Sequence, residues 1–228
     1  MTKILLVEDE DAIRKFVKIN LEREHYEVYE AATGEDGIEI AREKKPEIVV
    51  LDIMLPGIDG FEVCKVLRSE FPELGIIILS AKSEDLDKIM GLQYGTDDYL
   101  TKPFNPTELS LRIKSLERRL EIESDSKNSI VQNPFKLDTY ARKFYKNDKE
   151  LILTPTEYQI MKLFMENPGK ALKREEILSL VWGEEFIVDS KIVDVNMRRL
   201  RAKIEPNPAK PKYIETVWGL GYRWYTGV

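Results

Sequence analysis

The chain has 228 residues, of which 43% are hydrophobic and 33% are charged, so it has enough apolar residues to build a core and is not a disordered chain. No apolar run approaches the roughly 20 residues that span a bilayer, so we expect no membrane association. The single cysteine, Cys64, excludes an internal disulfide and a cysteine-based zinc site, and it favours a cytoplasmic location.

The net charge of −6 is distributed unevenly along the chain. Residues 1–121 hold 17 Lys and Arg against 26 Asp and Glu, a net charge of −9, whereas residues 122–228 hold 18 against 15, a net charge of +3. The length suits two domains of ordinary size. The opposite signs indicate domains that meet different partners, although chance asymmetry between two ordinary domains also fits.

The first half of the chain alternates between strand and helix patterns. Short apolar runs predict five strands, at residues 3–7, 27–29, 48–51, 76–79 and 99–100. After each of them, apolar residues recur at helical spacing, as at Ile13, Val17 and Leu21. Five repeats of a strand followed by a helix predict a doubly wound parallel sheet in an α/β domain.

The second half begins after a polar stretch, residues 121–133, that precedes Pro134. This stretch indicates a short linker, which we place at 122–130 between domains at 1–121 and 131–228. Short strand patterns follow at 135–137, 143–146 and 150–153. Three helical segments then lie near 155–166, 173–182 and 189–204, and two strands at 214–217 and 222–225 close the chain.

Polar residues follow the predicted strands where each strand ends. Glu8 and Asp9 follow the first strand, and the third, fourth and fifth are followed by Asp52, Ser80 and Lys102. The carboxyl ends of parallel strands share one edge of a sheet, where ligands bind. A single Asp after a strand is more often a turn residue, but three carboxylates at one edge repel each other unless a cation neutralises them. Hard oxygen ligands without His or Cys favour Mg²⁺.

This arrangement predicts phosphoryl chemistry on Asp52, which lies centrally in the set. A carboxylate can attack phosphorus and form an acyl phosphate. We expect Asp9, Asp52 and the Met54 carbonyl to hold Mg²⁺, with Glu8 reaching the ion through water.

Residues 2–121 resemble the receiver domain of response regulators, through the stretches "ILLVEDE", "VVLDIMLPGIDGFEV", "IIILSAK" and "GTDDYLTKPF". The resemblance implies a flavodoxin-like five-stranded fold in which Asp52 takes a phosphoryl group from a phosphohistidine of a sensor histidine kinase. We expect Lys102 to place its charge at one phosphoryl oxygen and Ser80 to donate to another. The resemblance also implies that Ser80 and Tyr99 form a switch, although Tyr99 equally fits a core aromatic.

The receiver resemblance further implies a face on which two phosphorylated chains dimerise. Relatives with the same C-terminal domain carry charged pairs on the fourth helix, fifth strand and fifth helix. Six positions of this chain match them: Lys88, Asp97, Asp98, Glu108, Arg112 and Arg119. Exposed pairs contribute about 0–1 kcal/mol each, so they would set specificity and register more than affinity. A solvated charged face is the alternative.

Residues 190–204 predict a helix with two different faces. One stripe along this helix is apolar: Val193, Met197, Leu200 and Ile204. The opposite face carries Lys191, Val195, Arg198 and Ala202, with Arg199 and Arg201 on its flanks. Such a face suits the major groove, where arginines meet guanine edges and phosphates and a small apolar residue meets a thymine methyl. Taken alone, it equally fits a solvated surface.

Residues 151–226 resemble the winged-helix domain of the OmpR/PhoB family, through "LTPTEYQIMKLFMENPGK", "REEILSLVW", "VDVNMRRLRAKIE" and "YIETVWGLGYRW". The resemblance implies an α+β winged helix-turn-helix domain that binds promoter DNA. From the recognition helix it implies DNA contacts by Lys191, Asn196, Arg198, Arg199 and Arg201. It also implies that Thr216 and Tyr222 of the wing grip the DNA backbone, and that the loop 183–189 touches RNA polymerase.

The wing departs from the family pattern at Trp218. Many members carry Arg at this position, where it enters the minor groove. Tryptophan lacks the positive charge that this narrow, negative groove attracts. The sequence therefore leaves two roles open for Trp218, packing on the wing or on the sugar edges of DNA. Asn196 is a smaller departure, since His is frequent there.

These features predict a transcriptional regulator, not an enzyme, whose phosphorylation at Asp52 promotes dimerisation and promoter binding. A phosphohydrolase of the haloacid dehalogenase type also uses an aspartyl nucleophile, but it needs a second Asp two residues later, where this chain has Met54. A DNA binder that works without phosphorylation is the third possibility. The intact set of acidic, hydroxyl and lysine residues at the strand ends argues against it.

Overall fold

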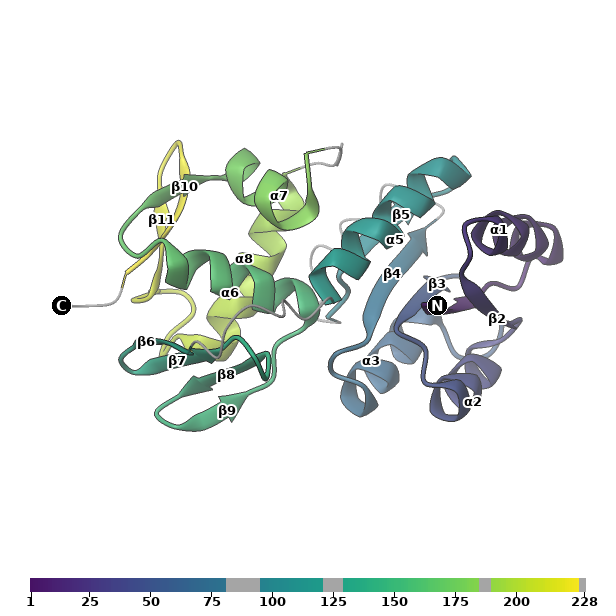
Figure 1. The fold of residues 1–228 in the computed structure, drawn as a ribbon, viewed down its shortest axis with the longest axis horizontal. Helices are drawn as coiled ribbons and strands as arrows, with labels where there is room; N and C mark the ends of the chain where they lie inside the picture. Colours follow the sequence, from purple (N-terminus) through teal and green to yellow (C-terminus); the bar gives the residue numbers. More distant parts are fainter. Residues whose placement is uncertain (81–94, 121–128, 185–189, 226–228) are drawn as a thin grey trace. The chain divides into compact units, whose positions relative to one another are not determined.

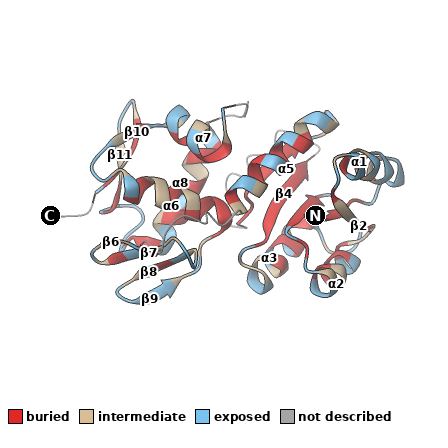
Figure 2. Cartoon of the chain, viewed as in Figure 1, coloured by how far each residue is buried: buried red, intermediate tan, exposed pale blue. Residues whose placement is uncertain are grey.

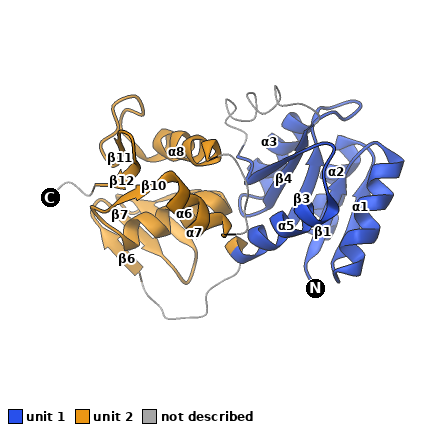
Figure 3. Cartoon of the chain, turned by 90° about the horizontal axis from the view of Figure 1, so that it is seen from above, with its two compact units in different colours: residues 1–118 blue, residues 119–228 orange. Residues whose placement is uncertain are grey.

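The structure is a computed structural model that describes residues 1–80, 95–120, 129–184 and 190–225. The backbone divides into two compact units, residues 1–118 and 119–228 (Figure 3). A five-stranded sheet belongs to the first unit, whereas a four-stranded and a three-stranded sheet belong to the second. Among the described residues, no helix combines the length and apolar character needed to cross a bilayer.

The first unit contains the predicted parallel sheet (Figure 1). Its strands run in the order β2-β1-β3-β4-β5, and every neighbouring pair is parallel. Their bounds are β1 Lys3–Val7, β2 Glu27–Ala31, β3 Ile48–Asp52, β4 Gly75–Ser80 and β5 Asp98–Thr101. The order reverses between β1 and β3, which places a topological switch point where these two strands end. The expected flavodoxin-like sheet is confirmed.

Helices cover both faces of this sheet: α1 Asp11–Arg23, α2 Gly34–Lys44, α3 Gly60–Glu70 and α5 Pro106–Leu120. The helices α2 and α3 pack against each other on one face, whereas α1 and α5 cover the other (Figure 1). Because both faces are covered, β3 and β4 are buried along their whole length (Figure 2). This burial explains why their sequences are continuous apolar runs instead of alternating ones.

The second unit has the predicted α+β architecture. An antiparallel sheet opens it, with β6 Ser129–Gln132, β7 Phe135–Asp138, β8 Lys143–Lys146 and β9 Lys149–Leu151. Three helices follow, α6 Pro155–Glu166, α7 Arg174–Trp182 and α8 Lys191–Ile204. A second antiparallel sheet, in the order β10-β12-β11, is formed by Ala171–Lys173, Gly221–Trp224 and Ile214–Val217. The hairpin of β11 and β12 is the wing.

Local sequence explains where the helices of this unit begin and which face they bury. At the start of α6, the Thr154 side chain and Glu157 form a capping box, and Pro155 occupies the first turn. The predicted apolar stripe of α8 is confirmed, because all four of its members are fully buried: Val193, Met197, Leu200 and Ile204.

Two strands were not predicted from the sequence. The strand β6 begins at Ser129, inside the polar stretch expected to be linker, and it pairs with β7 from Ser129 to Gln132. The strand β10 has three residues and pairs with β12. Both are short edge strands: β6 is half polar and none of its residues is buried, and β10 has too few residues for an apolar pattern to show.

Candidate functional site

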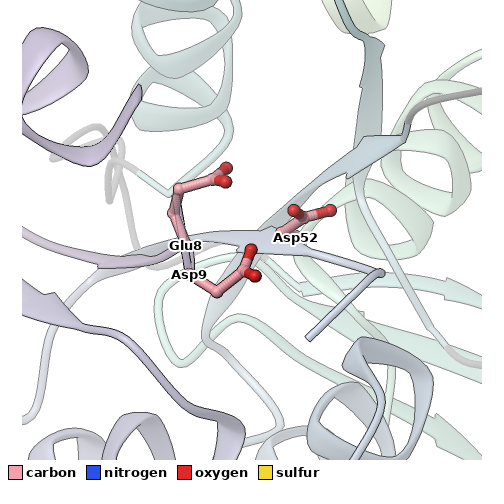
Figure 4. A group of neighbouring side chains, drawn as sticks. All are labelled: Glu8, Asp9 and Asp52. Atoms are coloured by element: carbon pink, nitrogen blue, oxygen red, sulfur yellow. The ribbon is translucent and has the colours of Figure 1, made fainter. Parts of the chain in front are cut away.

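Three carboxylates gather where β1 and β3 end at the switch point (Figure 4). We call Glu8, Asp9 and Asp52 the acidic cluster. One carboxylate oxygen of each residue lies within 4.8 Å of the others. Glu8 and Asp52 are buried, with Asp52 only 3% exposed, whereas Asp9 is exposed. The predicted convergence of these three side chains is confirmed.

Lys102 joins the acidic cluster from the end of β5. Its Nζ donates hydrogen bonds to Asp52 Oδ2 at 2.7 Å and to Glu8 Oε1 at 2.8 Å. Its backbone N–H donates to the Ser80 carbonyl at 2.7 Å, which ties this loop to the end of β4, and the Lys102–Pro103 peptide bond is cis. One ammonium group therefore contacts two of the three carboxylates but offsets only one negative charge.

The acidic cluster shifts the pKa values of its members. Burial raises the pKa of Glu8 to about 6, against the opposing effect of the hydrogen bond from Lys102. Burial alone would lower the pKa of Lys102, but the hydrogen bonds to Asp52 and Glu8 outweigh it and raise that pKa. Glu8 therefore holds its proton more tightly than an ordinary carboxyl does, and an added cation would compete with that proton.

The backbone around Asp52 is held closely in place. The Met54 N–H donates to Asp52 Oδ1 at 3.1 Å, and the Gly60 N–H donates to the Ile53 carbonyl at 2.9 Å. A Cβ added at Gly60 would lie 2.1 Å from the Asp52 carbonyl oxygen. The first turn of α3 thus approaches the end of β3 as closely as a glycine allows.

Ser80 and Tyr99, the expected switch residues, are both buried. Ser80 ends β4, one residue beyond the pairing of Asp52 with Leu79. Tyr99 lies in β5 opposite Ile78. These positions bring Ser80 to the same sheet edge as Asp52, while the buried ring of Tyr99 fits a core aromatic as well as a switch.

The described residues expected to mediate dimerisation are engaged within the chain, and four of them, Asp97, Asp98, Arg112 and Arg119, are buried instead of exposed. Arg112 pairs with Asp98 at 2.9 Å and with Glu108 at 2.6 Å. Asp97 accepts a hydrogen bond from Arg68 Nη2 at 2.8 Å. Arg119, the first residue of the second unit, is buried, and its Nη1 donates to Thr156 Oγ1 at 2.6 Å. Lys88 lies outside the described residues.

The helix α8 exposes only part of the set expected to contact DNA. Lys191 and Arg198 are exposed, and Val195 between them is half-buried. Asn196 is 1% exposed and donates through Nδ2 to the Ile192 carbonyl at 2.9 Å, and Arg199 is also buried. The structure therefore places the last two in the interior of the unit, away from the exposed basic face.

The other three residues expected to contact DNA tie the wing to α8. Arg201 Nη2 donates to Thr216 Oγ1 at 2.8 Å and to the Ile214 carbonyl at 2.6 Å. The Tyr222 hydroxyl donates to Asp194 Oδ1 at 2.7 Å. Burial and the hydrogen bond to Asp194 raise the pKa of Tyr222 to about 12. These contacts fix the wing against the helix, so we call them the wing clamp.

Two members of the wing clamp, Asp194 and Arg174, were not predicted from the sequence. Arg174, at the start of α7, donates through Nε to Asp194 Oδ1 at 2.7 Å, and its guanidinium lies 5.0 Å from the centre of the Tyr222 ring. The only available signal was an acidic residue in an otherwise basic helix, at Asp194. A carboxylate at that place would repel phosphates unless a cation of the protein engaged it.

Known proteins resemble the chain in both units. Residues 4–114 match the response regulator receiver domain, and residues 148–224 match the C-terminal domain of transcriptional regulatory proteins. The chain is 44% identical to the transcriptional regulatory protein AfsQ1 of Streptomyces coelicolor, over 98% of both chains. It is 43% identical to the alkaline phosphatase synthesis transcriptional regulatory protein PhoP of Bacillus subtilis, over 97% of this chain and 95% of the other.

A solved structure agrees with these matches. The response regulator DrrB of Thermotoga maritima, an OmpR/PhoB homologue, is 35% identical to the chain, with a TM-score of 0.52 over 99% of each chain. The receiver match covers the acidic cluster, and the C-terminal match covers α8 and the wing. The chain therefore belongs to the OmpR/PhoB family of two-component response regulators, DNA-binding transcriptional regulators in which a receiver domain precedes a winged-helix domain.

Proposed function

We propose that Asp52 accepts a phosphoryl group from a phosphohistidine of a sensor histidine kinase, and that this step promotes dimerisation and promoter binding. The observation that carries the proposal is a buried carboxylate, Asp52, with an ammonium group 2.7 Å from its Oδ2 and two further carboxylates within 4.8 Å. In the transfer, an oxygen of Asp52 bonds to phosphorus, the phosphorus–nitrogen bond breaks, and its electron pair returns to the imidazole ring.

The acidic cluster fits Mg²⁺ as the cofactor of this step. All three side chains offer hard oxygen atoms, and the exposed carboxylate of Asp9 gives an ion access from solvent. Asp9, Asp52 and the Met54 carbonyl would hold the ion, with Glu8 acting through water. When bound, the ion supplies positive charge to the phosphoryl oxygens.

The remaining groups at the sheet edge would contact the phosphoryl group once it is bonded to Asp52. Lys102 already donates to the Asp52 oxygen, so its charge lies next to the position of a new phosphoryl oxygen. The Ser80 hydroxyl would donate a hydrogen bond to another phosphoryl oxygen. The ring of Tyr99 would then move inward with Ser80, and the two residues together would form the switch. Phosphorylation adds about −1.5 to −2 charge at neutral pH, which is the local change that the switch reads.

We further propose a cytoplasmic location and, on phosphorylation, a homodimer through the charged face that includes Asp97, Asp98, Glu108 and Arg112. RNA polymerase would meet the segment 183–189, of which residues 185–189 lie outside the described residues. A dimer binds two half-sites about one helical turn apart. Because its two DNA-binding domains are joined, the second binds at a high effective concentration, and the affinity for DNA rises without any new kind of contact.

The test uses acetyl phosphate and Mg²⁺ with the full chain, followed by intact-mass measurement and light scattering. Wild type treated with acetyl phosphate is first used to select duplexes from a randomised pool. Gel-shift titrations then measure binding to the selected duplexes. Wild type should gain one phosphoryl group, dimerise and bind more tightly. Asp52→Asn should do none of these, while Asp148→Asn, the same change at an exposed position, should behave as wild type.

Two results would contradict the proposal. If untreated Asp52→Asn dimerised and bound as the phosphorylated wild type does, phosphorylation would not be the switch. Steady turnover of a small phosphate ester that depends on Asp52 would instead make the protein a phosphohydrolase.

A further inference from the structure

Trp218 is the most exposed large apolar side chain among the described residues. The chain has three tryptophans: Trp182 and Trp224 are 0% exposed, whereas Trp218 is 92% exposed. Its indole therefore does not pack on the wing, which removes one of the two roles left open by the sequence. Tryptophan is highly buried on average, so an indole this exposed is unusual, and its place in the fold decides what it can contact.

The tip of the wing presents this indole from a defined turn. The last pair of the hairpin is Val217 with Gly221, and the Leu220 N–H donates to the Val217 carbonyl at 3.0 Å. Gly219 has a φ of +76°, and a Cβ built there would meet nothing within 4 Å. The turn is closed by its own hydrogen bond, while the space around the tip is open.

The wing clamp holds this tip beside the basic face of α8. Thr216, two residues before Trp218, accepts the hydrogen bond from Arg201, and its strand partner Tyr222 donates to Asp194. Both bonds lead to α8, whose exposed side carries Lys191 and Arg198. Because the wing is already held against a DNA-binding helix, only the side chain of Trp218 has to be ordered when DNA arrives, which limits the entropy cost of the contact.

We propose that Trp218 packs against the deoxyribose edges of the duplex beside α8, as an apolar contact of the wing. Sugar edges carry no sequence information and no charge, so an indole there positions the protein without reading bases. Tryptophan buries a large area on contact, which suits it to this role better than a small side chain. The inference rests on the proposed binding of promoter DNA and deepens it.

Fluorescence tests the contact directly, because Trp218 is the one tryptophan that acrylamide can reach. Titration of the full chain with its selected duplex should lower the acrylamide quenching constant several-fold at saturation. Trp218→Phe supplies the background from Trp182 and Trp224, which are buried and should not change. A fall in quenching that follows protein concentration without DNA would mean that a second copy covers Trp218, and it would overturn the inference.

Affinity and its salt dependence separate an apolar contact from an ionic one. Trp218→Ala should weaken duplex binding about tenfold, and it should leave the slope of log K against log salt unchanged, because a sugar contact releases no counterion. Trp218→Arg should steepen that slope by about 1. Trp218→Phe should retain most of the affinity. Tyr140→Ala is the matched control, since this tyrosine is 68% exposed elsewhere in the same unit.

The outcomes distinguish this inference from the proposed function. If the wild type binds a selected duplex while Trp218 stays open to acrylamide and Trp218→Ala keeps full affinity, only the inference fails. If the wild type binds no duplex, the proposed function fails and the inference fails with it. The fold of each variant is checked by its melting temperature, which a fully exposed position should not alter.

Discussion

Lys102 is the residue on which the charge balance of the acidic cluster depends. It donates to both Glu8 and Asp52, which are buried. Lys102→Met would leave two buried carboxylates without their cation, a change that costs about 3 kcal/mol when a buried pair is broken. Thermal melting in EDTA should show this loss. Adding Mg²⁺ should raise the melting temperature of the variant more than that of wild type, because the ion then replaces the missing charge. An equal response in both proteins would contradict the prediction.

Glu8 gives the metal-free receiver a dependence on pH. Its pKa of about 6 in the folded chain exceeds the ordinary 4.5, so the folded state binds this proton more tightly than the unfolded state does. The resulting stability is present below pH 4.5 and is lost as the pH rises through about 6. A proton and Mg²⁺ compete for the same carboxylate, so Mg²⁺ should bind more tightly at about pH 7 than at about pH 5.

Mg²⁺-induced shifts in melting temperature, measured across this range, check the prediction. Glu8→Gln has no carboxyl proton to lose and should flatten the dependence. A slope that persists in Glu8→Gln would assign the titration to another group.

At the scale of elements, the approach of α3 to the end of β3 sets the position of Asp52. Gly60→Ala would place a Cβ 2.1 Å from the Asp52 carbonyl oxygen and 2.7 Å from Ile53 Cα, so the backbone must move. We expect a loss of about 1–3 kcal/mol in the free energy of unfolding and slower phosphorylation by acetyl phosphate. Gly37→Ala is the comparison, because the three atoms nearest to its added Cβ all belong to the buried side chain of Val7, from 2.9 Å, and none to the backbone. It should also lose stability, but without displacing the backbone at Asp52. Equal losses in both variants would argue against a special constraint at Gly60.

The wing and α8 act together through the wing clamp. Tyr222→Phe removes the hydroxyl that donates to Asp194 and keeps the ring beneath Arg174 and Arg201. Stability should fall by about 1 kcal/mol, and DNA affinity should fall with an unchanged salt slope, because the lost bond lies within the protein. Chemical denaturation and gel-shift titrations measure the two effects. Tyr213→Phe, also buried, is the matched control. A shallower salt slope in Tyr222→Phe would show instead that this hydroxyl contacts phosphate.

At the scale of the whole molecule, sequence patterns predicted what depends on periodicity and strand order. The receiver sheet and the convergence of Glu8, Asp9 and Asp52 follow from apolar runs and from the shared edge of parallel strands. The interior positions of Asn196 and Arg199 could not be predicted from the sequence. Helical spacing shows which residues share a face, but it does not show how far neighbouring elements cover the edges of that face. The wing clamp was equally inaccessible, since it joins side chains that are distant in sequence.

The charged face of the receiver offers a last prediction at this scale, since it couples the phosphorylation site to assembly. Arg112 is already held at 2.9 Å from Asp98 and 2.6 Å from Glu108 within one chain, so these groups must share or exchange partners when two chains meet. Arg112→Ala should still gain a phosphoryl group at Asp52 but should not dimerise. Intact mass and light scattering report the two steps separately.

The control for this prediction is an ion pair of similar length, although a more exposed one, away from that face. Arg42 lies 2.6 Å from Glu70 on the other side of the sheet, and Arg42→Ala should dimerise as wild type does. Because the proposed interface is ionic, the wild-type dimer should also weaken as the Debye length falls, from about 10 Å at 0.1 M salt to about 3 Å at 1 M. A phosphorylated dimer that survives both Arg112→Ala and high salt would have to be held by apolar contacts, and these ion pairs would then stabilise only the single chain.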